Sequence, residues 1–347
     1  MGTPDFALPA FQALLNDPAQ RFELCLVVSK PDAPAGRGFS PQSSIISQAA
    51  KTANIELLQP QSLYLDEHDH LVSRLAELDL DFTVVTAYGM LLTAEIIQAA
   101  RLGTINIHGS ILPRWRGAAP IERAILAGDT LTGVSIQAVR VELDSGPVYA
   151  SAATPIGEKT SSELSLELAQ RGAELLVECL PRIATGELIP VEQNARLVTY
   201  AAKLLPNELA LDPTMSTEIN LRQVQAANQR NPARARIAGR GVQILQARAA
   251  EEFNKKKLLL ATADGWLEVL ELLPDGRRRM SGQAFLAGLP ARTARAAELP
   301  TRTAQFSESP ARTAQAAELL TQTAQPAELP AQVAQPADQP ISWEMWG

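Results

Sequence analysis

Short apolar runs alternate with helical patterns through the first part of this 347-residue chain, and this alternation constrains its fold most. Runs rich in Val, Ile and Thr predict buried strands at 22–30, 81–89 and 103–109. Helical spacing predicts helices between and after them, at 43–53, 67–80 and 118–127. Alternation of strand and helix indicates an α/β fold with a doubly wound, mostly parallel sheet.

The pattern changes further along the chain. Residues 132–156 contain two strand runs around the turn Asp144-Ser145-Gly146, and a long helix is expected over 161–183. From about Val242 the chain is strand-like with Asp-Gly turns, which favours a small C-terminal β-barrel or sandwich. We therefore divide the chain into a first domain, a linker, a β-barrel domain and a tail, at 1–188, 189–206, 207–288 and 289–347.

The tail is a ten-residue repeat in five copies from Leu289 to Asp338, each closed by an acidic residue. Each copy has little to bury, and regularly placed prolines would interrupt any helix. We expect a disordered tail, and we expect its last residues, which include Trp343 and Trp346, to be a loose end.

Composition and charge restrict the class of protein. Residues 1–206 carry a net charge of -8 and residues 207–288 a net of +3, which suggests a catalytic domain beside a module that meets an anionic partner. An ordinary solvated domain would also explain the +3. Cys25 and Cys179 lie in apolar runs and predict buried thiols in a reducing compartment. No apolar run is long enough for a membrane span, so a cytoplasmic protein is expected.

The residues that suggest chemistry lie where the strand predicted at 103–109 ends. Alternation along a strand places Asn106 and His108 on the same face. In open α/β sheets ligands bind at the carboxyl ends of strands. An amide donor beside an imidazole suits transfer of an acyl group to an external amine, with Asn106 on the carbonyl oxygen and His108 on the proton. Asp144 could orient His108. A hydrogen-bonded structural histidine and a plain turn are the alternatives.

Several segments, in order and spacing, resemble the methionyl-tRNA formyltransferase family over about 285 residues. They are GTPDFA (2–7), KPDAPAGRG (30–38), TAYGMLL (86–92), INIHGSILPRWRGAAPIERAILAGD (105–129) and GVSIQAVRVELDSGPV (133–148), with weaker similarity at TYAAKL (199–204) and RRRMSGQAFLAG (277–288). The resemblance implies formyl transfer from 10-formyltetrahydrofolate to the α-amino group of methionyl-initiator tRNA, a step of translation initiation. The first domain would be the formyltransferase catalytic domain and the β-barrel domain would bind tRNA.

The resemblance also assigns site residues. The family's catalytic residues fall on Asn106, His108 and Asp144, and its folate-binding residues on Ser110, Ile111, Leu112, Pro113, Ala87, Tyr88 and Gly89. Its tRNA-inserting loop falls on Gly36, Arg37 and Gly38, for which a flexible turn is the alternative. No metal is expected, and we interpret His68 and His70 as a solvated helix start. A monomer is expected.

Two departures from the family matter. Family members carry an apolar strand just before GTPDF, and here the first strand is missing, which would expose strand edges. We expect a start assigned about ten residues late, with a destabilised remnant as the alternative. The residues 228–232 replace an aromatic, Pro-rich turn, which puts tRNA docking in doubt. A formyl-folate enzyme acting on a small amine or water, and a non-catalytic RNA-binding remnant, therefore remain open as alternative functions.

Overall fold

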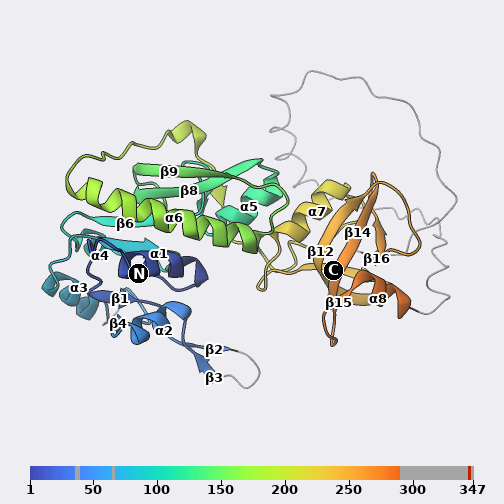
Figure 1. Cartoon of the computed structure of the whole chain (residues 1–347), viewed down its shortest axis with the longest axis horizontal. Coiled ribbons are helices and arrows are strands. Elements are labelled where there is room, and N and C mark those ends of the chain that lie inside the picture. The colour runs from blue at the N-terminus through green and yellow to red at the C-terminus, as the bar shows by residue number, and fades with distance from the viewer. Residues whose placement is uncertain (36–39, 65–66, 290–342, 345–347) are drawn as a thin grey trace.

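A computed structural model describes residues 1–35, 40–64, 67–289 and 343–344. Its first domain contains a two-stranded parallel sheet and a four-stranded mixed sheet (Figure 1). β1 (Leu26–Val28) pairs in parallel with β4 (Glu56–Leu58), and β5 (Thr83–Thr86) pairs in parallel with β6 (Thr104–His108). Antiparallel pairs then join β6 to β8 (Leu131–Ala138), and β8 to β9 (Val148–Pro155). The predicted α/β fold is confirmed, with a parallel half and an antiparallel half.

Helices cover both faces of these sheets. Ile105 and Ile107 of β6 share a buried core with α1 (Leu8–Leu15), α5 (Pro120–Ala127) and α6 (Ser161–Ala184). Val28 and Val85 pack in a second core with α3 (Glu67–Glu77) and α4 (Ala94–Gln98). Since side chains alternate along a strand, the intervening Asn106 and His108 do not face α6.

Other elements complete the first domain. The 3-10 turn η1 (Asp5–Ala7) precedes α1, and α2 (Ile45–Thr52) packs beside β1 and β4. A small hairpin is formed by β2 (Ala33–Ala35) and β3 (Ser40–Gln42). The helices predicted at 43–53, 67–80, 118–127 and 161–183 match α2, α3, α5 and α6 within three residues at each end. A capping box between Thr160 and Glu163 explains why α6 begins where it does.

Met1 and Gly2 lie between β1 and β5. The amide of Gly2 donates to the Val28 carbonyl, Gly2 forms a parallel bridge with Thr86, and the Met1 amino group donates to the Val84 carbonyl. Beside them runs a groove of about 130 Å³, lined mainly by Glu23–Val27, by Leu80 and Phe82–Val84, and by α1. The strand predicted at 22–30 is therefore shorter than expected, because residues 23–25 border this groove instead of a partner strand.

The linker is held against the first domain. Its strand β10 (Tyr200–Ala201) pairs in parallel with β7 (Arg116–Gly117), and Val191 bridges to Val148 of β9. The 3-10 turn η2 (Ala195–Leu197) lies between these two contacts. The chain thus returns past the end of β6 before it enters the second domain.

The second domain contains one antiparallel sheet with two helices, α7 (Thr217–Ala226) and α8 (Gly282–Ala287). Its strand order is β13-β14-β12-β11-β16, and β15 (Met280–Ser281) pairs with β14. The bounds of the first four are Leu259–Ala261, Trp266–Pro274, Arg240–Ala250 and Ala233–Ile237. The predicted Asp-Gly turns fall at the ends of β14. The predicted C-terminal sheet is confirmed. Among the described strands, no pairing between the two edges of the sheet closes it into a barrel.

Within the predicted tail 289–347, the structure describes Leu289 and β16 (Trp343–Glu344). Leu289 is buried in the core of the second domain, so the predicted disorder is wrong for this residue. β16 pairs antiparallel with Ile237 and Arg236 of β11. The expected loose end is wrong for these two residues, because their backbone extends the sheet beyond β11. The rest of the predicted disordered tail, 290–342 and 345–347, lies outside the described residues. Among the helices described, none has both the length and the apolar character that crossing a membrane requires.

Candidate active site at the end of strand β6

Asn106 and His108 occupy the carboxyl end of β6, as the sequence predicted. In the register of β6 and β8, Asn106 lies opposite Gln137 and His108 lies opposite Ser135. His108 is buried, and Asn106 is partly exposed. Four polar side chains from two neighbouring strands therefore gather near one end of the sheet.

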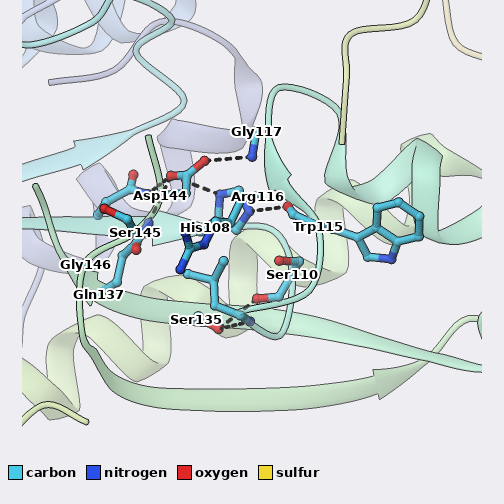
Figure 2. Close-up of polar contacts among 12 residues, drawn as sticks. His108, Ser110, Trp115, Arg116, Gly117, Ser135, Gln137, Asp144, Ser145 and Gly146 are labelled. Atoms are coloured by element: carbon cyan, nitrogen blue, oxygen red, sulfur yellow. Dashed lines mark hydrogen bonds and ion pairs between the residues drawn. The ribbon is translucent and has the colours of Figure 1, made fainter. Parts of the chain in front are cut away.

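Asp144 joins this group from the turn between β8 and β9. One carboxylate oxygen, Oδ1, lies 3.6 Å from His108 Nδ1 and accepts from Gln137 Nε2 at 3.0 Å and from Asn106 Nδ2 at 3.5 Å. The other, Oδ2, accepts the Gly117 amide at 2.9 Å (Figure 2). The three predicted catalytic side chains are thus brought together, and their catalytic roles remain predictions.

The second ring nitrogen of His108 faces a carbonyl. Nε2 lies 2.8 Å from the Trp115 carbonyl oxygen, which can only accept, so Nε2 carries a hydrogen and donates it (Figure 2). Trp115 adopts a left-handed backbone conformation with φ of 63° that turns this carbonyl toward the ring. In a neutral imidazole Nδ1 is then the nitrogen without a hydrogen, and it faces Asp144.

The segment Ser110–Pro113 follows β6 along the chain, and hydrogen bonds to the Ser135 side chain hold its backbone. The Ser135 hydroxyl donates to the Ser110 carbonyl at 2.8 Å and accepts the Leu112 amide at 3.1 Å. Leu112 is buried, whereas Ile111 is exposed at the surface. Of the predicted folate-binding side chains in this segment, Ile111 is therefore the one best placed to meet a ligand.

The predicted loop Ala87–Gly89 leaves the carboxyl end of β5, which is paired in parallel with β6. The loop consequently lies at the same edge of the sheet as His108. Ala87 and Gly89 have left-handed φ values of 47° and 75° and are exposed, while Tyr88 is 2% exposed. Burial raises the pKa of Tyr88 to about 12, and its hydroxyl finds no hydrogen-bond partner among the residues that the structure describes. With the Tyr88 side chain buried, the loop can offer mainly backbone groups to a ligand.

The two arginines that flank Trp115 differ in their partners. Arg114 forms two hydrogen bonds of 2.8 and 2.7 Å to Asp129, and its guanidinium lies 4.4 Å over the Trp115 ring. Burial raises the pKa of Asp129, but hydrogen bonds from Arg114 and Trp115 outweigh it and leave that pKa below its usual range. Arg116 is 93% buried and donates to the side chain of Gln193. Arg114 is therefore engaged in a salt bridge with Asp129.

The predicted tRNA-contacting residues Gly36, Arg37 and Gly38 lie outside the described residues. His68 and His70 lie in the first turn of α3, as expected, and no group of three His, Cys, Asp or Glu side chains in the described part of the chain could hold a metal ion.

The sequence analysis did not predict Ser135, Gln137 and Gln193 as residues of the site. The alternation Val-Ser-Ile-Gln-Ala over 134–138 places Ser135 and Gln137 on one face of a strand and could have indicated the first two.

Comparison with known proteins decides the family. Residues 2–183 match the formyl transferase family. A methionyl-tRNA formyltransferase from Bordetella pertussis is 40% identical over 306 residues, which cover 83% of this chain and 97% of the relative. The chain belongs to the methionyl-tRNA formyltransferase family. The resemblance found in the sequence is thereby confirmed.

Solved structures agree with the formyltransferase fold at lower identity. WlaRD, a sugar 3N-formyl transferase, was solved in the presence of dTDP and 5-N-formyl-THF; it is 17% identical, has a TM-score of 0.58 and covers 80% of this chain and 97% of its own. HypX from Aquifex aeolicus, in complex with tetrahydrofolic acid, is 20% identical with a TM-score of 0.52 over 69% of this chain. That match spans 43% of HypX. At such identities these structures support the fold alone.

Proposed function

We propose that this protein transfers the formyl group of 10-formyltetrahydrofolate to the α-amino group of methionyl-initiator tRNA, and so serves translation initiation in the cytoplasm. The observation that carries the proposal is the convergence of Asn106, His108 and Asp144 at one end of β6 in a chain so closely related to methionyl-tRNA formyltransferases. A formyl acceptor as large as tRNA is also consistent with the net charge of +3 over residues 207–288.

Asn106 stabilises the oxygen charge that develops as the amine adds to the formyl carbon. An α-amino group has a pKa of about 7.7–8.0, so a good fraction is already the free base at neutral pH. The barrier then lies in the negative charge on the formyl oxygen. The Asn106 amide is a hydrogen-bond donor at a partly exposed edge, and removal of one such donor in known enzymes costs about 2.7–4 kcal/mol.

His108 takes the proton that the amine loses. Its Nε2 already donates to the Trp115 carbonyl, so Nδ1 is the nitrogen that accepts, and the Asp144 carboxylate 3.6 Å away neutralises the resulting imidazolium. As the bond between the formyl carbon and the folate nitrogen breaks, His108 returns the proton to that leaving nitrogen. The Asp144 carboxylate is held in this position by hydrogen bonds from the Gly117 amide and the Gln137 side chain.

The folate is held by Ser110–Pro113 and by Ala87–Gly89, through the exposed Ile111 and the backbone of both segments. Their common position at the carboxyl edge of β5 and β6 fits a flat ligand laid across the strand ends. The proposal includes no metal, since the formyl group is transferred from an already activated position on the folate.

The second domain and the hairpin loop meet the tRNA. Residues 207–288 form a small β-barrel in this proposal, with Arg230, Arg236 and Lys255-Lys256 exposed on its loops and strands. Gly36, Arg37 and Gly38 contact the acceptor end. One protomer suffices for both substrates, so the active protein is a monomer.

One assay tests the proposal. Purified protein is incubated with 10-formyltetrahydrofolate and charged initiator tRNA, and formyl-methionyl-tRNA is measured for the native chain, Asn106→Ala, His108→Ala and a surface control, Asn16→Ala. We expect product from the native chain and the control, and turnover lower by about a hundredfold or more in both site variants. Formate released without tRNA product would instead indicate hydrolysis, and a folded protein without any turnover would indicate a remnant.

A further inference from the structure

Gln193 connects the linker to the candidate active site, and the formyl-transfer chemistry described above makes no use of it. It lies in the linker between Val191, which bridges to β9, and β10, which pairs beside Arg116. Its side chain is half-buried, whereas its neighbours Glu192 and Asn194 are exposed. It therefore points inward from a segment that otherwise runs along the surface.

The Gln193 side-chain amide makes three hydrogen bonds of 3.0 Å or less at the site, and a fourth, of 3.5 Å, runs from its Nε2 to Gln137 Oε1. Its Nε2 donates to the backbone carbonyl oxygens of Asp144 at 2.9 Å and Gly146 at 2.7 Å. Its Oε1 accepts from Nε of the buried Arg116 at 3.0 Å. An amide is the only neutral side chain that can donate twice and accept at once in this way.

The turn that Gln193 holds has a strained backbone. Asp144 has a φ of 49°, in the left-handed region that costs a residue other than glycine about 1 kcal/mol. Gly146 is pressed so close to β8 that a Cβ there would lie 1.7 Å from the Ala138 carbonyl oxygen. The direction of the Asp144 carboxylate therefore depends on how firmly this turn is held.

We propose that Gln193 is a positioning residue for formyl transfer, which aims the Asp144 carboxylate at His108 by fixing the backbone of the 144–146 turn. The expected loss of turnover rests on the proposed function. The expected change in the position of the Asp144 carboxylate rests on the hydrogen bonds alone. Because Gln193 belongs to the segment that leads into the second domain, it also ties the geometry of the site to the path of the linker.

Two substitutions separate this role from an anchoring role toward Arg116. Gln193→Leu removes all of these hydrogen bonds, whereas Gln193→Glu keeps an acceptor for Arg116 and loses the donors to the turn and to Gln137. The matched control is Glu192→Gln, which changes the neighbouring side chain that pairs with Arg140 on the surface. In both Gln193 variants we expect kcat to fall between about ten- and a hundredfold, with the KM for 10-formyltetrahydrofolate unchanged.

A second measurement, of the His108 imidazole by NMR, does not require formyl-transfer activity. The chain has three histidines, so the imidazole ¹⁵N resonances of His108 can be assigned and followed by NMR. Loss of the Gln193 donors is expected to shift the Nδ1 resonance, which faces Asp144, in both variants and not in Glu192→Gln. Absence of formyl transfer by the native chain would defeat the proposed function, and these shifts would still test the positioning role.

Two results would overturn the inference. One is kcat within twofold of the native value in both Gln193 variants, together with unchanged His108 resonances. The other is a normal kcat in Gln193→Glu with a low kcat in Gln193→Leu, which would assign Gln193 to Arg116 instead of Asp144. Thermal unfolding of all variants identifies any that are misfolded, and Gln193→Glu still decides the question if Gln193→Leu does not fold.

Discussion

Ser135 shows how much one hydroxyl can organise at this site. It is fully buried and joins the Ser110 carbonyl to the Leu112 amide, and the Ser151 hydroxyl lies 2.8 Å from it. Since its only hydrogen goes to Ser110, Ser151 is the donor in the last contact. The backbone of the proposed folate-binding segment is thus held by a side chain from the neighbouring strand.

At the residue scale we predict that Ser135→Ala weakens folate binding more than it slows transfer. The substitution leaves two buried backbone groups without partners, each at a cost of about 1–3 kcal/mol. We expect a higher KM for 10-formyltetrahydrofolate, a small change in kcat and a lower unfolding midpoint. Ser151→Ala is the matched control, because it keeps both backbone hydrogen bonds. An unchanged KM in Ser135→Ala would contradict this account of the segment.

The sequence could indicate the candidate catalytic residues but not the groups that contact and orient them. Asn106, His108 and Asp144 lie in segments whose composition and family resemblance pointed to the site. The Gly117 amide, the Trp115 carbonyl and Gln193 act through backbone groups or from a distant segment. No pattern of residue types encodes a contact that depends on a backbone conformation or on how the linker is laid over the domain.

At the element scale, periodicity worked where an element has one buried face. The helices α2, α3, α5 and α6 match their predictions, whereas α1, with Pro9 in its first turn, and the short α8 were not predicted. Strand lengths depend on neighbours, which periodicity does not show. The groove beside Met1 is the clearest example, since residues 23–25 have strand composition and none of the described strands pairs with them.

The groove beside Met1 leads to a prediction about residues fused before Met1. The Met1 amino group is buried there, and burial lowers its pKa to about 5 from an ordinary value of 8.0. Between these pH values the unfolded chain binds a proton that the folded chain does not, so the free energy of unfolding falls as pH decreases from 8 to 5. The slope is at most about 1.4 kcal/mol per pH unit.

An apolar six-residue extension fused before Met1 replaces the amine by an amide and fills the groove, and its matched control is a Gly/Ser extension of equal length. We expect both extensions to remove this pH dependence in urea unfolding, and only the apolar one to raise the midpoint at pH 8. Equal midpoints for the two extensions would show that the groove does not accept a strand.

At the scale of the whole molecule, the two domains share a core. Leu209 and Ala226 come from beyond the linker, are almost completely buried and pack in the core of α5 and α6. Asn228 donates to Glu122 of α5 at 3.0 Å, and Arg123 pairs with Glu208. Burial raises the pKa of Glu122, and the hydrogen bond from Asn228 opposes that rise. The change in net charge after residue 206 therefore does not coincide with the edge of the hydrophobic core, which continues across it.

This shared core predicts unequal effects of two truncations. A chain ending at Leu289 keeps the buried cores of both domains and, among the contacts of the described residues, loses the two-residue pairing of β16, so we expect its unfolding midpoint and formyl transfer to stay close to those of the full chain. A chain ending at Pro206 loses Leu209, and loss of one such buried side chain costs about 2–5 kcal/mol. It also exposes the α5 surface, so we expect a much lower midpoint and weaker folate binding. The measurements are thermal unfolding and folate titration of the three chains. An unchanged midpoint for the chain ending at Pro206 would show that the first domain folds independently of the second.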